Sequence, residues 1–278
     1  MTLAEHHKKM LIEESSIAQN VAEARGYRTI EKKVELKTLG FSDSQRNTPG
    51  LLIPVYSPTG EIATYQFRPD QPRIGKDGKP VKYEAPSGTR MVLDVHPFAR
   101  KILGNPAVPL FVTEGTKKGD ALVSRGLCTV ALLGVWNWRG RNGNGGLTAL
   151  AEWECFALNG REVYIVFDSD IMLKLGVYRA MVRLKAFLEG RGAEVRIVYL
   201  PPGEGAKKQG VDEFLAAGNT VTDLLNLANT DLKEPLNDEG EAPELDTQAA
   251  TLVRYAKDAE LFRTPDGEAY VIFRVKEG

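Results

Sequence analysis

Three carboxylates follow apolar segments of the sequence, and their types and spacing are typical of a metal site. The run 110–113 leads directly into Glu114, and the run 163–167 leads into Asp168-Ser169-Asp170. Alternate residues of an extended segment share a face, so Asp168 and Asp170 are expected to point the same way. Three carboxylates held together repel one another, and a hard divalent cation such as Mg²⁺ relieves that repulsion. Such a site suits phosphoryl transfer, because metals polarise phosphate oxygens and orient the nucleophile.

Each acidic motif also has an ordinary structural explanation when it is taken alone. An Asp-x-Asp pair before a helix often caps that helix, and Asp170 could act only in this way. A Glu-Gly pair after a strand is equally common. The two motifs in this order, on successive strand ends, favour the metal site.

The segments around these acids alternate between strand and helix patterns. Apolar runs typical of buried strands lie at 110–113, 128–133, 163–167 and 194–200. Helices are predicted at 116–125, 148–158, 172–189, 211–217 and 221–229. This alternation predicts an α/β fold, a parallel sheet with flanking helices, in which function gathers at the carboxyl ends of the strands. If strands 110–113 and 163–167 are neighbours, Glu114 joins the two aspartates.

Residues 1–101 are predicted to form a smaller α+β subdomain that precedes this sheet. Its expected elements are helices at 3–14, 16–25 and 31–38, and a β-hairpin with strands at 51–56 and 62–68. Ser15 or Ser16 is expected to cap the second helix. A loop rich in Pro, Gly and cations follows the hairpin, and residues 68–101 carry eight cations against four acids.

The remaining boundaries follow from composition. We expect the α/β domain at 102–230, an acidic linker at 231–247 and the start of a further domain at 248–278. That last part reads as a helix at 247–262 and a hairpin at 263–275, which bury too little to be stable alone. The chain is therefore expected to end inside a further domain.

Net charge does not argue against a nucleic-acid partner. The whole chain carries −1, but residues 1–101 hold 16 basic and 12 acidic side chains, while the linker holds seven acids and one Lys. Cys128 and Cys155 lie in apolar runs like ordinary buried thiols, which favours a reducing cytoplasm. No apolar run is long enough to span a membrane. The three histidines, which lack partners at metal-ligand spacing, are predicted to be surface residues: His6, His7 and His96.

The stretch from FVTEG (111–115) to VFDSD (166–170) resembles the Toprim domain of primases, topoisomerases and some nucleases. The preceding hairpin LLIPVYSPTGEIATYQFR (51–68) and KYEAP (82–86) are similar to the amino-terminal part of a bacterial primase polymerase core. The resemblance covers about residues 50–217. It is closest to Toprim-containing primase-like proteins of phages, plasmids and other mobile elements.

This resemblance implies roles for several residues. Glu114, Asp168 and Asp170 would bind Mg²⁺ or Mn²⁺, and Asp212 matches a late acidic position that could support a metal or lie at a helix N-terminus. Arg68 and Lys82 would face the template or nucleotide phosphates. Apart from the resemblance, three further cations are expected to bind nucleotide or nucleic acid: Arg73, Lys117 and Lys118. Cations on a Gly/Pro loop can neutralise phosphates without reading bases.

The sequence departs from the primase pattern at one position. Primases of this type usually carry a second acid four residues after the Glu, and here that position is Lys118. This puts a second metal in doubt. No zinc-binding module precedes the core in this sequence.

A glycine-rich loop carries a second set of candidate binding residues. Trp136 and Trp138 could stack on bases, with Arg139 and Arg141 on phosphates. The alternative is that the two rings pack under the loop. The loop does not match a nucleotide-binding P-loop.

The main hypothesis is a primase-like nucleotidyltransferase core of a mobile element. It would act on single-stranded DNA with nucleoside triphosphates and a divalent metal. One alternative is a Toprim metal-dependent nuclease, in which the same carboxylates direct water to a phosphodiester. Another is a non-catalytic DNA-binding module of a primase-helicase, joined to a helicase domain or partner and motivated by Lys118.

Overall fold

The computed structural model describes residues 3–76, 78–141, 145–235, 260–263 and 269–272. The chain divides into two compact units, Met1–Leu236 and Asn237–Gly278. Within the described residues, no helix is long and apolar enough to cross a bilayer.

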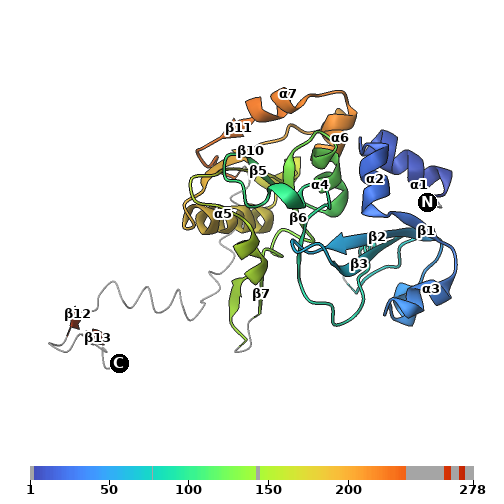
Figure 1. Cartoon of the computed structure of the whole chain (residues 1–278), viewed down its shortest axis with the longest axis horizontal. Helices are drawn as coiled ribbons and strands as arrows, with labels where there is room; N and C mark the ends of the chain where they lie inside the picture. The colour runs from blue at the N-terminus through green and yellow to red at the C-terminus, as the bar shows by residue number, and fades with distance from the viewer. Residues whose placement is uncertain (1–2, 77, 142–144, 236–259, 264–268, 273–278) are drawn as a thin grey trace. The chain divides into compact units, whose positions relative to one another are not determined.

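The first unit is built around a six-stranded sheet (Figure 1). Its strand order is β11-β10-β9-β5-β6-β4, in which the inner four strands are parallel and each edge strand is antiparallel to its neighbour. The bounds are β4 (Leu93–Asp94), β5 (Leu110–Glu114), β6 (Cys128–Leu132), β9 (Glu162–Val166), β10 (Glu194–Val198) and β11 (Ala228–Asn229). The predicted α/β fold with a mainly parallel sheet is confirmed.

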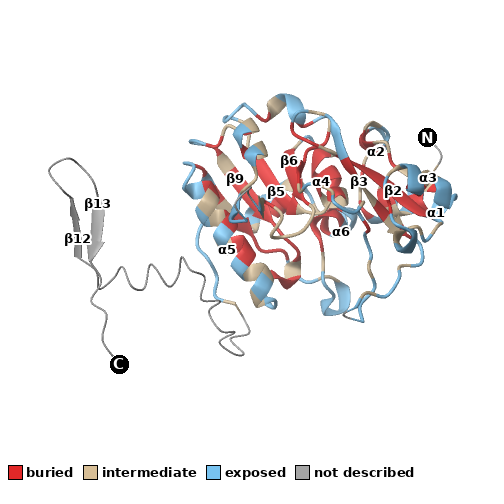
Figure 2. Cartoon of the chain, turned by 90° about the horizontal axis from the view of Figure 1, so that it is seen from below, coloured by how far each residue is buried: buried red, intermediate tan, exposed pale blue. Residues whose placement is uncertain are grey.

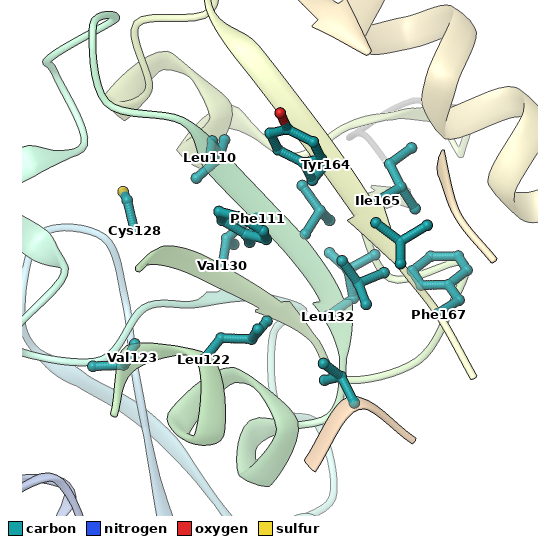
Figure 3. Close-up of a cluster of buried hydrophobic side chains, with 14 of the residues drawn as sticks. Leu110, Phe111, Leu122, Val123, Cys128, Val130, Leu132, Tyr164, Ile165 and Phe167 are labelled. Atoms are coloured by element: carbon teal, nitrogen blue, oxygen red, sulfur yellow. The ribbon is translucent and has the colours of Figure 1, made fainter. Parts of the chain in front are cut away.

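The central strands lie in the core of this unit, as Figure 2 shows in red. Val112, Val130 and Ile165 are fully buried on adjacent strands, and the β-branched side chains suit a pleated surface covered on both faces. Phe111 and Tyr164, which are register partners on β5 and β9, stack with their ring centroids 5.0 Å apart (Figure 3). This packing fixes the two strands that carry the acidic motifs.

Helices flank the sheet and follow the prediction at most positions. The α-helices are α4 (Thr116–Val123), α5 (Leu175–Glu189), α6 (Val211–Ala216) and α7 (Val221–Asn226). Short 3₁₀ turns are η3 (Arg100–Ile102), η4 (Ala151–Cys155), η5 (Ser169–Met172) and η6 (Glu204–Ala206).

The predicted helix at 148–158 is wrong. The structure has a hairpin of β7 (Arg139–Arg141) and β8 (Leu147–Ala149), followed by η4. Trp153 is fully buried and its indole donates to the carbonyl oxygen of Trp138 at 2.9 Å. Hairpin pairing with β7 therefore overrides the helical pattern at 148–149, and residues 151–155 form a 3₁₀ turn rather than an α-helix.

The amino-terminal elements, blue in Figure 1, form a smaller three-stranded antiparallel sheet with helices. Its strands are β1 (Arg28–Ile30), β2 (Gly50–Tyr56) and β3 (Ile62–Pro69). The helical elements are α1 (Glu5–Lys9), the π-helical turn η1 (Met10–Glu14), α2 (Gln19–Arg25), α3 (Lys33–Thr38) and the 3₁₀ turn η2 (Asp43–Gln45). The predicted hairpin corresponds to β2 and β3.

Two expectations for this region are wrong. The N-cap residue of α2 is Ala18, whereas Ser15 is buried and Ser16 has a left-handed φ of 53°. His7 and His96 are buried rather than exposed, because each has polar partners inside the fold. The His96 ring contacts the carbonyl oxygen of Val21 at 3.0 Å.

A buried ion network joins the amino-terminal elements to the larger sheet. Arg25 at the end of α2 donates to Asp94 of β4 at 2.6 Å and to Asp120 of α4 at 2.5 Å and 2.9 Å. The Tyr27 hydroxyl also donates to Asp120, at 2.8 Å. Strand β4 itself pairs with β6, so part of residues 1–101 belongs to the six-stranded sheet.

The second unit contains the antiparallel pair β12 (Glu260–Arg263) and β13 (Ala269–Ile272). The predicted hairpin corresponds to these strands, and the prediction of helix at 260–262 is wrong. Residues 247–259 of that predicted helix lie outside the described residues, as does the linker from 236 onward.

Candidate active site

A cavity of about 520 Å³ lies at the carboxyl ends of the central strands. Ionisable side chains dominate its lining: Arg68, Lys82, Glu114, Lys117, Lys118, Asp168, Lys208, Asp212 and Glu213. Gln66, Tyr83 and Thr116 add polar groups to its wall. The cavity therefore presents carboxylates and cations side by side.

Glu114 and Asp168 meet because β5 and β9 are parallel neighbours, with Thr113 opposite Val166. The sequence alone did not establish that the two strands are neighbours, and the structure shows that they are. Both side chains line the cavity. Burial raises the pKa of Glu114, and the Asp168 carboxylate raises it further, against the opposing effect of Lys118. A bound cation would favour the ionised form.

Two lysines pair with Asp168, which is only 3% exposed. Its Oδ1 atom lies 2.5 Å from Lys118 Nζ, and its Oδ2 atom lies 2.6 Å from Lys208 Nζ. Burial opposes the charge of Lys118, but Asp168 outweighs that effect and the pKa of Lys118 is raised. A fixed ammonium group thus stands beside the central carboxylate.

Asp170 lies next to this pair but is not among the residues that line the cavity. Its Oδ2 atom is 2.6 Å from Lys174 Nζ and 3.6 Å from Lys208 Nζ. The residue between the aspartates, Ser169, exchanges two hydrogen bonds of 2.9 Å with the backbone of Gln209. These bonds position Lys208 beside both carboxylates.

Asp212 comes from the start of α6 and is 5% exposed. Its Oδ1 atom is buried without a hydrogen-bond partner, and its Oδ2 atom lies 3.7 Å from Lys117 Nζ. The neighbouring Glu213 accepts the Gly210 backbone N–H at 2.8 Å and so takes the capping role. Asp212 is left with an uncompensated oxygen in the wall of the cavity.

Some of the predicted phosphate-binding cations line the cavity and others do not. Arg68 at the end of β3 lines the cavity together with the exposed Lys82. Lys117 donates to Ser15 Oγ at 2.7 Å, and burial lowers the pKa of its ammonium group. Arg73 is not a lining residue, because it donates to both oxygens of Glu84, at 2.6 Å and 3.1 Å.

The four candidate binding residues of the glycine-rich loop are not among the residues that line the cavity: Trp136, Trp138, Arg139 and Arg141. Trp138 is 7% exposed and stacks on Phe187 with ring centroids 5.1 Å apart. The structure therefore corrects the expectation for Trp138, which packs in the core and is not open to a base. Trp136 is half-buried, with the Arg139 guanidinium 4.3 Å from its ring centroid. Arg141 is exposed and donates to the carbonyl oxygen of Gly145 at 3.0 Å.

The carboxylates of the cavity are of the chemical type that a hard divalent cation prefers, but among the described residues no three of them place ligand oxygens within 4.8 Å of one another. Glu114, Asp168 and Asp212 offer carboxylate oxygens to one cavity, and one buried oxygen of Asp212 has no hydrogen-bond partner. Lys118 supplies a positive charge where a second cation would need an acid. The cavity thus combines carboxylate oxygens with the ammonium group of Lys118.

Lys208, which contacts both aspartates of the Asp-x-Asp motif, was not predicted from the sequence. The signal was present as Lys207-Lys208, close before the acidic start of the predicted helix 211–217. This pair of lysines could not be recognised as part of the site, because nothing in the sequence shows that the turn at 203–210 packs on Ser169.

The central part of the chain is similar in sequence to a family without an assigned role. Residues 98–221 match the family described as a domain of unknown function (DUF3854). An uncharacterised protein of Picosynechococcus is 30% identical over 165 residues, which cover 48% of this chain and 16% of that protein. The chain therefore spans a small part of the curated relative that it matches.

Solved structures with the same fold are primase catalytic domains. They include a DNA primase domain from Pseudomonas aeruginosa (17% identical, TM-score 0.53, covering 80% of this chain and 72% of that one). The Aquifex aeolicus primase, with zinc-binding and RNA polymerase domains, is 19% identical at a TM-score of 0.51, over 81% of this chain and 56% of that one. A DnaG primase catalytic domain bound to single-stranded DNA is 15% identical at a TM-score of 0.52, over 80% and 71%. The chain has the fold of bacterial DnaG-type primase catalytic cores.

Proposed function

We propose that this chain is a primase-like nucleotidyltransferase core that acts on single-stranded DNA with nucleoside triphosphates and a divalent metal. The observation that carries the proposal is the cavity at the ends of β5 and β9, where Glu114, Asp168 and Asp212 face Arg68 and Lys82. This set of charges suits a polyphosphate that arrives with a cation. The primase-type fold supports the same activity.

The charged residues of the cavity form two groups, one that would bind a metal ion and one that would bind phosphates. Glu114, Asp168 and Asp212 would hold one Mg²⁺ or Mn²⁺, which when bound polarises phosphate oxygens. Arg68 and Lys82 would hold the phosphates of nucleotide or template by charge-assisted hydrogen bonds. Asp170 would keep Lys208 close to Asp168, through its own contact with that lysine.

Lys118 would act as a fixed positive charge in this reaction. Nucleotidyl transfer joins a hydroxyl oxygen to the α-phosphorus and releases pyrophosphate, so negative charge builds up on the phosphate oxygens and on the leaving group. An ammonium group already held in the cavity stabilises that charge without reorganisation. We therefore propose one metal and one lysine in place of two metals.

The proposal extends to the finer assignments made from the sequence. These are the Toprim identity of residues 102–230, the amino-terminal subdomain at 1–101, replication of a mobile element in the cytoplasm, and a helicase domain or partner. The Glu and Asp-x-Asp motifs, and the hairpin 51–68 with the basic loop that follows it, support the first two of these assignments.

Primer synthesis on single-stranded DNA tests the catalytic claim. The chain and its Asp168→Asn variant are incubated with NTPs or dNTPs and with Mg²⁺ or Mn²⁺. The control variant is Glu162→Gln, at the start of the strand β9 that leads to Asp168, where Glu162 pairs with Arg196. Product is expected from the wild type and the control but not from Asp168→Asn. Absence of product from the wild type, or product that persists in Asp168→Asn, overturns the claim.

One observation favours a second candidate, a non-catalytic DNA-binding module. Both oxygens of Asp168 already pair with lysines, Lys118 and Lys208. This module would bind single-stranded DNA equally well with and without EDTA, whereas the catalytic core would make primers only with metal. Cleavage of DNA without added nucleotides would instead indicate the nuclease.

A further inference from the structure

Among the residues that the structure describes, one group of three metal-ligating side chains places its ligand atoms within 4.8 Å of one another. It consists of His6 and His7 of α1 and Asp70, which directly follows β3. His6 Nε2 is 2.9 Å from Asp70 Oδ2, and His7 Nε2 is 2.8 Å from Asp70 Oδ1.

The way the two histidines converge is unusual for a helix. Consecutive residues of an α-helix do not face each other, because each step turns by about 100°. Here the two rings nevertheless approach to 4.0 Å between centroids and direct the same nitrogen at one carboxylate. A simple histidine–aspartate hydrogen bond needs only one of them.

A further contact fixes the buried member of the cluster. His7 is fully buried, and its Nδ1 atom lies 2.8 Å from Thr29 Oγ1 on β1. Thr29 Oγ1 in turn accepts the Ala4 backbone N–H at 2.8 Å. An outer partner on the second ring nitrogen, which sets the tautomer and orientation, is the usual support of a metal-bound histidine.

We propose that His6, His7 and Asp70 form a binding site for a transition metal of the Zn²⁺ class. Two imidazole nitrogens and one carboxylate oxygen are borderline donors, which suit Zn²⁺, Co²⁺ or Ni²⁺ and not Mg²⁺. The two N···O separations in the cluster need only a small outward movement to admit an ion with bonds of about 2.0–2.2 Å. The His6 side chain is 57% exposed, so solvent can complete the coordination.

The site would tie the amino-terminal helix to the strand that serves the cavity. Asp70 lies two residues after Arg68, which lines the cavity and whose Nη1 atom is 2.6 Å from Met10 Sδ. A metal held by α1 and the end of β3 would limit movement of that strand end. The zinc site itself does not depend on the proposed nucleotidyl transfer.

Metal retention by the full chain without a histidine tag tests the proposal. EDTA-treated protein is dialysed against Zn²⁺ in excess Mg²⁺, the retained zinc is measured by mass spectrometry, and Co²⁺ is used as a spectroscopic probe. One zinc per chain is expected for the wild type and for Lys8→Gln, a control on the same helix. His6→Gln and Asp70→Asn are expected to bind Zn²⁺ at least about tenfold more weakly, equivalent to ~1.4 kcal/mol.

The outcomes separate this site from the cavity. His6 is exposed, so His6→Gln leaves the core unchanged, and circular dichroism verifies that each variant is folded. Zinc binding that is unchanged in His6→Gln and Asp70→Asn overturns the proposal, as does no retained zinc in the wild type. Binding that is lost only in Asp168→Asn places the ion in the cavity and also overturns it. The zinc measurement is independent of primer synthesis, so a failure of primer synthesis does not change its interpretation.

Discussion

At the scale of single residues, Lys118 distinguishes this cavity from one lined by acids alone. Its ammonium group lies 2.5 Å from Asp168 Oδ1, and this carboxylate raises the pKa of Lys118 against the opposing effect of burial, so the ammonium group stays charged. A charge in this position competes with a cation for the same oxygen. It also stabilises negative charge on a phosphate, so its net effect on activity combines opposite contributions.

Removal of Lys118 should separate these contributions. Lys118→Met frees Asp168 Oδ1 and removes a repelling charge, so Mg²⁺ affinity is expected to rise by about tenfold, ~1.4 kcal/mol. Isothermal titration calorimetry with Mg²⁺ measures this, with Lys118→Arg as the variant that keeps the charge. Mg²⁺ affinity that is equal or weaker in Lys118→Met contradicts the competition.

Glu114 gives a pH dependence whose sign follows from its raised pKa. The folded carboxyl keeps its proton to a higher pH than the unfolded one, whose ordinary value is 4.5, so the folded state binds more protons in the interval above that value. Stability from this group is therefore present at low pH and is lost as pH rises through the folded pKa. Glu114→Gln removes the effect.

Urea unfolding in EDTA at pH 4 and pH 8 measures the pH dependence of stability that Glu114 causes. The free energy of unfolding of Glu114→Gln, relative to the wild type, is expected to be higher at pH 8 than at pH 4. A difference that is equal at the two pH values would show that burial does not perturb Glu114.

At the scale of elements, helix α4 links the cavity to the core of the fold. It carries Lys117 and Lys118 towards the cavity and Asp120 towards Arg25. Between them Gly119 faces β6, where an added Cβ atom would lie 3.0 Å from Ala131 Cβ. The helix can approach the strand this closely only because the position has no side chain.

Gly119→Val is therefore expected to destabilise the protein by about 1–3 kcal/mol, because overpacking forces α4 away from β6. The matched control is Gly176→Ala in α5, where an added Cβ atom meets nothing within 4 Å. It should instead stabilise the helix by up to about 1 kcal/mol. Thermal and urea unfolding compare the two variants, and equal stabilities would contradict the close-packing argument.

The sheet could be predicted from the sequence because its strands are short apolar runs. The predicted runs at 110–113 and 163–167 agree with β5 and β9 within one residue at each end. The region 148–158 could not be predicted, because β8 depends on pairing with β7 and on the burial of Trp153. The local pattern identifies elements that are stabilised by burial, and it fails where pairing and packing outside the segment determine its structure.

The candidate site was predictable only in part, for a related reason. Glu114 and Asp168 follow strands directly, so the sheet itself brings them together. Lys208 and the orphan oxygen of Asp212 depend on how the 203–210 turn and α6 pack, which no local pattern encodes. His7 was taken for a surface residue because its partner Asp70 lies 63 positions away.

At the scale of the whole molecule, a net charge of −1 coexists with a cation-lined cavity. Lys118 and Lys208 pair with Asp168, which leaves Arg68 and Lys82 as the cations best placed to meet a DNA backbone. The molecule is therefore expected to bind single-stranded DNA locally and modestly. Its affinity should depend on salt through a few contacts.

A salt titration measures those contacts. With about two phosphates neutralised, log K should fall against log salt with a slope of about −1.4, since each contact contributes about −0.7. Lys82→Ala is expected to reduce the slope by about 0.7, while Lys185→Ala on α5, which pairs with Glu189, leaves it unchanged. Equal slopes for the two variants would place the DNA elsewhere.

The buried network of Arg25 should contribute strongly to stability. Arg25→Met leaves Asp94 and Asp120 without their cation, and breaking a buried pair in this way costs about 3–5 kcal/mol. The control Arg28→Met removes an exposed pair with Glu35 and should change stability by less than about 1 kcal/mol. Urea unfolding of both variants decides, and a small loss in Arg25→Met would contradict the network's role.

This network also limits how the chain can recombine. Arg25 lies in the amino-terminal part and Asp120 in the helix beside the cavity. Recombination with a related gene between these two positions would therefore separate the buried arginine from the carboxylate that neutralises it. A chimera made at residue 101 is expected to fold only when the donor and recipient agree at both positions. Inheritance of the amino-terminal hairpin and of the acidic sheet edge is thereby linked, although the two are far apart in sequence.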